Sequence, residues 1–221
     1  VIAKSINASF EEIIFTSGGT ESMNLAIKGL AFANKHKKHI LTTRIEHKCV
    51  LNSCKWLEKE GWELEYVKVD KEGYVNLEDL KIKIRKDTLF FSVIHANNEI
   101  GTIQNLKEIG KICKDIHLLT DACQSYTKVD INVKKMNLDF VALNAHKIYG
   151  PKGVGALYIR RGIRIVPFNH GGDHEFKTRA GTENIPGIVG FAESVNISKS
   201  KDVNEMSKVR DYFISKALEI E

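Results

Sequence analysis

This sequence lacks long apolar runs, closely spaced cysteine pairs and large clusters of like-charged residues. No apolar stretch approaches the roughly 20 residues that a membrane-spanning helix needs, and the first residues lack the layout of a signal peptide. The four cysteines form neither a CxxC pair nor a zinc-ligand spacing. We therefore expect reduced core thiols, no membrane span, no metal site and a cytoplasmic location.

The charge balance is only mildly basic. The formal net charge is +5, and the 33 Lys and Arg residues are spread along the chain rather than gathered in a patch with interleaved aromatics. Nucleic-acid binding is therefore not expected. With 43% hydrophobic and 28% charged residues, the chain can bury a substantial core, either as one large domain or as a domain plus a fragment.

Short apolar runs rich in β-branched residues alternate with longer segments of helical period. This alternation predicts an α/β fold in which helices wrap a mainly parallel sheet. We expect strands at residues 12–16, 39–43, 63–69, 88–96, 117–121, 139–144 and 153–159, and helices near residues 21–34, 48–60, 77–85 and 106–115. Apolar residues recur at helical spacing from Val203 to Ile220, so a further helix is expected to run to the last residue.

Lys147 follows a strand-like apolar segment and precedes a tight turn rich in glycine. A lone lysine at a strand end is a candidate Schiff-base former, although most lysines are solvated surface charges. Such a lysine needs a phosphate cradle, a carboxylate facing a pyridine nitrogen and a flat group against the ring if it is to hold a pyridoxal 5′-phosphate (PLP) aldehyde.

The chain offers a candidate for each requirement. The segment TSGGTES at residues 16–22 follows a predicted strand and opens a predicted helix, so its backbone N–H groups can bind an anion; alone, it also fits a simple glycine turn. Asp121 ends a predicted strand, where open α/β sheets gather ligands, although an aspartate there also suits a helix cap. His47 and Asn98 follow two other predicted strands, and each alone would be interpreted as structural.

Six segments occur in an order that resembles one protein family. They are TSGGTES (16–22), EHK (46–48), NNEIG (97–101), DACQS (121–125), HKIYGPKG (146–153) and RAGTEN (179–184). They resemble the cysteine desulfurases of the NifS and IscS type, which are PLP enzymes of the class V aminotransferase superfamily. The resemblance covers nearly the whole chain and implies the large domain of PLP-dependent transferase fold type I, with a mainly parallel seven-stranded sheet flanked by helices.

The resemblance also implies roles for individual residues. Lys147 would bind the cofactor covalently and then shuttle protons at the substrate α-carbon, while His47 would stack on the ring and act in acid–base steps. Asp121 would pair with the pyridinium nitrogen. The other cofactor contacts would come from Asn98 and Gln124 at the ring oxygen, from Gly19, Thr20, Asn144 and His146 around the phosphate, and from Thr182 of the other subunit.

The reaction of that family removes sulfur from L-cysteine and leaves L-alanine and a persulfide on an enzyme cysteine. The sulfur then passes to an iron–sulfur scaffold or to a tRNA-thiolation protein. The resemblance thus implies a homodimeric enzyme whose partners are L-cysteine and a sulfur-acceptor protein. The alternatives are a selenocysteine lyase or other class V PLP enzyme, a non-catalytic scaffold that keeps the fold, and a nucleotide-binding Rossmann domain, which is disfavoured because neither nucleotide-phosphate signature is present.

The chain departs from the family pattern in several places. The family's nucleophilic cysteine and its substrate-carboxylate arginine lie downstream of RAGTEN, and no cysteine here matches that nucleophile. We therefore expect residues 1–200 to form a PLP-binding large domain without its N-terminal edge, and residues 201–221 to begin a helix leading to an absent C-terminal small domain. Locally, Asn144 replaces the usual serine of Ser-x-His-Lys, Asp173 interrupts a glycine triplet and Phe176 stands where arginine is common.

Overall fold

The structure is a computed structural model that describes residues 1–198 and 200–220. One sheet contains the seven strands β1 (Ile13–Thr16), β2 (His39–Thr43), β3 (Glu63–Val67), β4 (Thr88–Ile94), β5 (His117–Asp121), β6 (Phe140–Asn144) and β7 (Gly155–Ile159). The helices are α1 (Ile2–Ser5), α2 (Gly19–Ala33), α3 (Lys48–Lys59), α4 (Leu77–Lys83), α5 (Leu106–Ile112), α6 (His174–Lys177), α7 (Ile185–Ile197) and α8 (Ser200–Ala217), with short 3-10 turns η1 (Phe10–Glu12) and η2 (His146–Ile148).

All seven expected strands and all four expected internal helices are confirmed. The strands expected at residues 63–69 and 88–96 end two residues early, at Val67 and Ile94. Just beyond these ends, Val69 and Ala96 form only isolated bridges. The sequence pattern did not indicate α7, and the final helix ends at Ala217 rather than at the last residue; the expectation for residue 221 lies outside the described residues.

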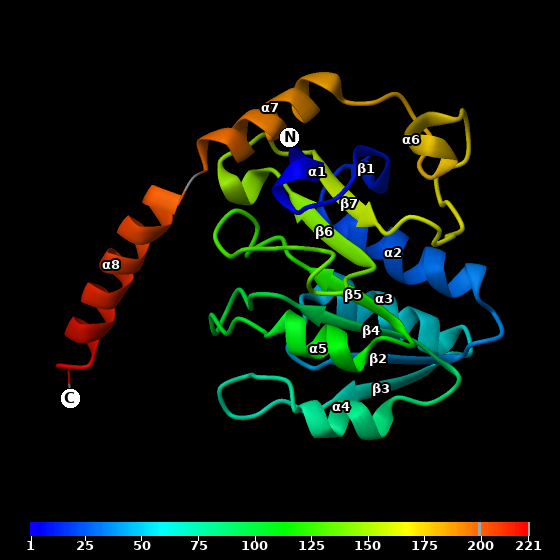
Figure 1. The fold of residues 1–221 in the computed structure, drawn as a ribbon, viewed down its shortest axis with the longest axis horizontal. Helices are drawn as coiled ribbons and strands as arrows, with labels where there is room; N and C mark the ends of the chain where they lie inside the picture. Colours follow the sequence, from blue (N-terminus) through cyan, green and yellow to red (C-terminus); the bar gives the residue numbers. More distant parts are fainter. Residues whose placement is uncertain (199, 221) are drawn as a thin grey trace.

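The strand order in the sheet is β1-β7-β6-β5-β4-β2-β3 (Figure 1). The five strands from β3 to β6 are parallel, whereas β7 is antiparallel to both β6 and β1. Two reversals restore the direction, so β1 runs parallel to β6. The carboxyl ends of β1, β2, β4, β5 and β6 therefore meet at one edge of the sheet, where α/β folds gather their functional groups.

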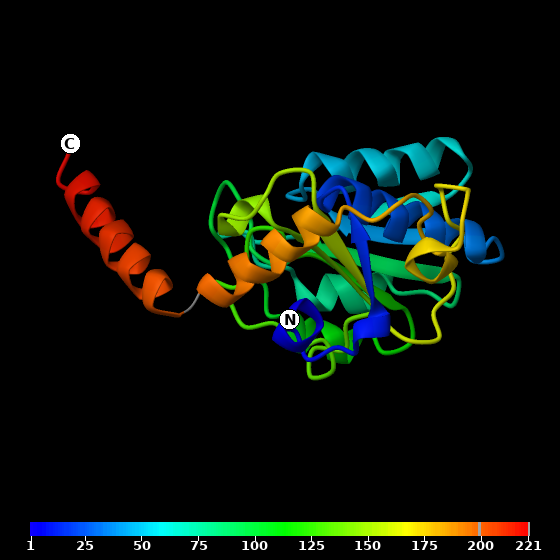
Figure 2. The ribbon, with the colours of Figure 1, turned by 90° about the horizontal axis from the view of Figure 1, so that it is seen from above.

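Helices cover both faces of this sheet, as Figure 2 shows. On one face, α2 and α3 pack on alternate strand residues, including the fully buried Phe90 and Phe140. On the other face, α4, α5 and α7 pack on the intervening residues, such as Phe91 and Val141. Strands buried on both sides are typical of parallel sheets. Each fully buried aromatic stabilises the fold by about 2–3 kcal/mol through apolar burial.

Asparagine side chains cap the N-termini of three helices, α4, α5 and α7. Asn76 accepts from the N–H of Asp79 at the start of α4, and Asn105 accepts from the N–H of Glu108 at the start of α5. Asn184 caps α7 in the same way. Each cap satisfies a backbone donor that the helix itself leaves unpaired, which fixes the boundary between loop and helix.

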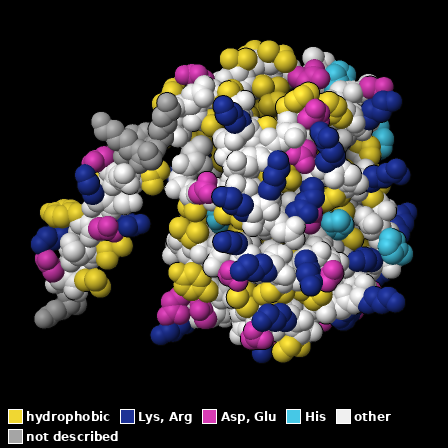
Figure 3. Space-filling model, viewed as in Figure 1, with side chains coloured by type: hydrophobic (Ala, Val, Ile, Leu, Met, Phe, Trp, Pro, Cys, Tyr) yellow, Lys and Arg dark blue, Asp and Glu magenta, His cyan; other side chains and the backbone are white. Residues whose placement is uncertain are grey.

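The last helix, α8, extends away from the body (Figures 1 and 2). Val209, Tyr212 and Phe213 are each more than 60% exposed, and hydrophobic side chains are visible along α8 in Figure 3, where Lys and Arg are scattered over the body. Each described helix is too short or too polar to cross a bilayer. The division into a large domain and a helix leading to a further domain stays a prediction.

Candidate active site

A cavity of about 240 Å³ opens at the carboxyl edge of the sheet. Ten residues were expected from the sequence to bind the cofactor or to act in catalysis. Nine of them line this cavity: Gly19, Thr20, His47, Asn98, Asp121, Gln124, Asn144, His146 and Lys147. Ile94, Cys49 and Cys123 complete the lining. The tenth, Thr182, is exposed in the segment between α6 and α7 and is not part of this lining, so its expected contact with another subunit stays a prediction.

The strand register places the glycine loop beside the lysine turn. Gly155 on β7 pairs with Thr16 on one side and with Asn144 on the other. The absence of a side chain at this position is required, because a Cβ on Gly155 would lie 2.6 Å from Gly18 Cα. The loops that follow β1 and β6 are thus held against each other at one point of the sheet.

The loop after β1 presents unpaired backbone donors at the start of α2. The N–H groups of Gly19, Thr20 and Glu21 have no hydrogen-bond partner within residues 1–198 and 200–220, since the first bond of this helix runs from Ser22 N to Gly18 O. These donors and the positive end of the helix dipole suit an anion. Binding of a phosphate group by these backbone donors therefore requires no positively charged side chain in the loop.

The turn that carries Lys147 is fixed by its own neighbours. Asn144 Oδ1 accepts from the N–H of Lys147 at 3.1 Å, so the asparagine that replaces the usual serine orients this turn. Lys128 Nζ donates to the carbonyls of Gln124 (3.0 Å) and Lys147 (3.3 Å) and joins two lining segments. Burial, and then the nearby charge of Lys147, lowers the pKa of Lys128. Burial, and then the charges of Lys147 and Lys152, likewise lowers the pKa of His146.

Asp121 and His47 reach the cavity from two strand ends: Asp121 is the last residue of β5, and His47 lies in the loop between β2 and α3. Asp121 is 5% exposed, and its Oδ1 accepts from the N–H of Cys123 at 2.9 Å, which fixes the plane of the carboxylate. His47 is the N-cap of α3, where its Nδ1 accepts from the N–H of Cys49 at 3.2 Å. Both side chains are therefore positioned by short backbone contacts rather than by side-chain packing alone.

Two cysteines of the lining received no role from the sequence. Cys123 is buried against Gly19, and burial, and then the charge of Asp121, raises the pKa of its thiol well above the usual range. Cys49 is partly exposed, and the same two causes raise the pKa of its thiol to about 12. Their spacing, two residues after Asp121 and two after His47, is the sequence signal that places them at the cavity.

Glu46 is a buried carboxyl group directly below this edge. Its Oε1 accepts from Thr43 Oγ1 (2.7 Å) and from the N–H of Ile94 (2.9 Å), whereas its Oε2 is buried without a hydrogen-bond partner among the described residues. Burial raises the pKa of Glu46 to about 8, and the neighbouring charge of Asp121 acts in the same direction. A neutral acid fits this position, because an unpaired buried carboxylate oxygen is costly.

Replacement of Glu46 by glutamine is expected to flatten the pH dependence of stability. Below pH 4.5 both states are protonated; between pH 4.5 and about 8 only the unfolded state loses the proton, so the free energy of unfolding falls by about 1.4 kcal/mol per pH unit. Glu46→Gln removes this pH-dependent contribution. Urea denaturation at pH 5, 6, 7 and 8 measures the free energy of unfolding of wild type, of Glu46→Gln and of the control Glu58→Gln, which changes an exposed residue of α3. If the free energy of unfolding depended on pH equally in wild type and in Glu46→Gln, Glu46 would not be a neutral buried acid.

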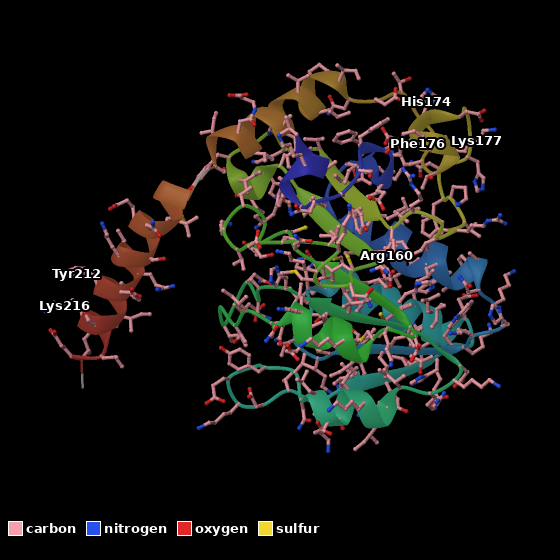
Figure 4. All side chains as sticks on the ribbon, in the orientation of Figure 1. Arg160, His174, Phe176, Lys177, Tyr212 and Lys216 are labelled. Carbon is pink, nitrogen blue, oxygen red and sulfur yellow. The ribbon has the colours of Figure 1, made fainter. Side chains whose placement is uncertain are left out.

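The departure at Phe176 has a local structural counterpart. Glu175, Phe176 and Lys177 all have positive φ angles, between 47° and 65°. The ring of Phe176, which Figure 4 labels beside Lys177, lies 6.5 Å from that of Phe10. Glu175 Oε2 accepts from the N–H of Phe15 on β1 at 2.8 Å. The phenylalanine therefore packs towards the N-terminal segment, away from the cavity lining.

Comparison with known proteins supports one family. The family model described as Aminotransferase class-V matches residues 1–219. A cysteine desulfurase IscS of Dictyoglomus turgidum is 51% identical over 219 residues, which cover 96% of this chain and 56% of that protein. The mitochondrial cysteine desulfurase of Candida albicans is 51% identical over 205 residues, which cover 90% of this chain and 42% of that protein. The chain thus spans about half the length of the curated relatives it matches.

Solved structures give the same result for the fold. A structure titled NifS-like protein matches with a TM-score of 0.95 at 40% identity and covers 99% of this chain and 62% of that chain. A structure titled SspA in complex with cysteine matches with a TM-score of 0.86 at 44% identity and covers 88% and 58%. The expected fold class is confirmed, and because the family model matches all but the last two residues, this chain belongs to the class-V aminotransferase family.

Proposed function

We propose that this chain binds PLP in the 240 Å³ cavity and forms the cofactor-binding part of a cysteine desulfurase. The observation that carries the proposal is that one cavity gathers Lys147, Asp121, His47 and the glycine loop from four separate strand ends. An amine, a carboxylate, an imidazole and an anion cradle are the groups that this cofactor requires. Cys49 and Cys123, to which the family resemblance gives no role, complete the lining together with Ile94.

The residues present fit the parts of the cofactor. The free N–H groups of Gly19 and Thr20 would hold the phosphate, with His146 beside them. Asp121, held by Cys123 N–H, would keep a proton on the pyridine nitrogen, and His47 would lie against the ring. Asn98 and Gln124 would donate to the ring oxygen. When bound, PLP supplies an electron sink for the carbon next to the substrate amine.

The chain's own residues then control protons and orientation. Lys147 would anchor the cofactor through its amine and afterwards move a proton at the substrate α-carbon. Its placement depends on Asn144 Oδ1 and on Lys128, which together fix the turn from both ends. Asp121 would act throughout as a fixed negative charge opposite the lysine.

For the whole enzyme, we propose L-cysteine as substrate and L-alanine and an enzyme-bound persulfide as products. The names of the relatives, cysteine desulfurase IscS and mitochondrial cysteine desulfurase, support this reaction. The proposal includes a homodimer in which Thr182 reaches the partner's cofactor phosphate, a sulfur-acceptor or iron–sulfur scaffold protein as partner, and a cytoplasmic location. The nucleophilic cysteine and the arginine for the substrate carboxylate belong to the part of the relatives that this chain does not match.

Two measurements test the proposal. The purified chain mixed with PLP should become yellow, and borohydride should fix one cofactor per chain, as measured by intact mass. The full-length protein should convert L-cysteine to L-alanine with sulfide release in the presence of a thiol. Cofactor attachment without alanine formation would support the alternative of a PLP-fold scaffold, and faster turnover of L-selenocysteine than of L-cysteine would support a selenocysteine lyase.

A further inference from the structure

A thiol, an imidazole and a carboxylate converge on one wall of the cavity. Cys49 Sγ lies 3.0 Å from His47 Nδ1. A carboxylate oxygen of Asp121 completes a group in which all three ligand atoms lie within 4.8 Å of one another. Sulfur, imidazole nitrogen and carboxylate oxygen are the ligand types that zinc and related divalent cations of the first transition row accept.

The distance between Cys49 Sγ and His47 Nδ1 suits a tetrahedrally coordinated ion after a small movement of the cysteine side chain. Bonds of about 2.3 Å to sulfur and about 2.0 Å to nitrogen place these two atoms about 3.6 Å apart at the tetrahedral angle, compared with 3.0 Å here. Because Cys49 is partly exposed, rotation of its side chain can provide the difference. Asp121 uses Oδ1 to hold Cys123 N–H, which fixes the carboxylate and leaves further lone pairs for an ion. The single lone pair of His47 Nδ1 accepts from the N–H of Cys49 in the free protein, so the ion replaces this N-cap contact of α3.

The group is also accessible. His47 and Cys49 line both the 240 Å³ cavity and an adjoining hollow of about 440 Å³ beside Trp56, so a hydrated ion can reach the sulfur. A second cluster, formed by His39, Glu63 and Glu65 on β2 and β3, is less suited to a cation. There Arg85 already pairs with Glu63 at 2.7 Å and with Glu65 at 3.8 Å, which neutralises those carboxylates.

We propose that in the cofactor-free protein His47, Cys49 and Asp121 bind one thiophilic divalent cation such as Zn²⁺, with water completing the coordination. The ion replaces the thiol proton, which passes to solvent, and nothing is oxidised or reduced. Because His47 and Asp121 are also the residues proposed to hold the PLP ring, cation and cofactor exclude each other; this consequence rests on the proposed function, whereas the binding does not.

Cobalt(II) titration of the cofactor-free, reduced chain tests the site. One equivalent of Co²⁺ should produce a thiolate-to-cobalt absorption band in the near ultraviolet and release about one proton per ion, and Zn²⁺ should remove the band. Cys49→Ser should abolish the band and weaken cobalt binding by at least about tenfold. Cys113→Ala, a core thiol at the end of α5, and Glu65→Gln in the second cluster should leave the band unchanged.

The outcomes separate this inference from the proposed function. A chain that gives no band, or a band that persists in Cys49→Ser, overturns the cation site even if PLP binds normally. A band in a chain that takes up no PLP overturns the proposed function but supports the cation site. Prior attachment of PLP should prevent the band, and an unchanged band in the PLP-bound chain would overturn the mutual exclusion.

Discussion

Lys147→Ala is expected to abolish the borohydride-stable attachment of PLP. Among the described residues, Lys147 is the one lysine that lines the cavity, and the turn that presents it is held by Asn144 and Lys128. The anion cradle at Gly19 and Thr20 remains intact in the variant, so residual non-covalent binding is expected, weaker by about 100-fold, or about 3 kcal/mol. Intact-mass analysis after reduction and a PLP titration measure the two effects.

Lys152→Ala is the matched control for this experiment. Lys152 is exposed and lies five residues further along the same turn, outside the cavity lining. Its replacement should leave the borohydride-stable attachment at the wild-type value. If Lys147→Ala acquired the same mass increase and spectrum as wild type, the covalent role would belong to another amine and the site assignment would be wrong.

Gly19→Ala is expected to lower both PLP affinity and stability, because its Cβ would collide with Cys123 Sγ. Cys123 cannot move freely, since it is buried and its N–H holds Asp121 Oδ1. Overpacking of this kind costs about 1–3 kcal/mol. Relief of the collision displaces either the anion cradle or the carboxylate, so PLP affinity should fall by about tenfold, equivalent to about 1.4 kcal/mol.

The collision predicts a specific rescue. Cys123→Ala removes the sulfur, so the double variant Gly19→Ala/Cys123→Ala should recover most of the stability and affinity, with a coupling energy of about 1–2 kcal/mol. Cys54→Ala, another buried thiol on the same face of the sheet, should not rescue Gly19→Ala. Equal behaviour of the two double variants would show that the alanine acts through the helix start rather than through Cys123.

The strands were predictable because their composition and period are local properties of the chain. In this fold every strand except β3 is almost completely buried, so continuous runs of β-branched and aromatic residues identify the strands directly. Helix α7 was missed because Gly187 and Gly190 weaken its helical signal. The structure explains both glycines, since a Cβ on Gly190 would meet Pro151 and one on Gly187 would meet its own cap, Asn184. Phe191 then anchors α7 on Tyr126.

The sequence by itself determined the order of the elements and placed Lys147, Asp121, His47, Asn98 and the glycine loop near one edge of the sheet, since the carboxyl ends of parallel strands meet there. The other expected cavity residues, Gln124, Asn144 and His146, were implied only by the family resemblance. The sequence could not determine which other side chains face that cavity. Only the tertiary structure decided that Cys49 Sγ approaches His47 and Asp121, that Cys123 limits the space at Gly19, and that Glu46 is a neutral buried acid. The physical reason is that pKa shifts, close approach and ligand geometry depend on burial and on distances between loops, which three-dimensional packing sets and local sequence does not encode.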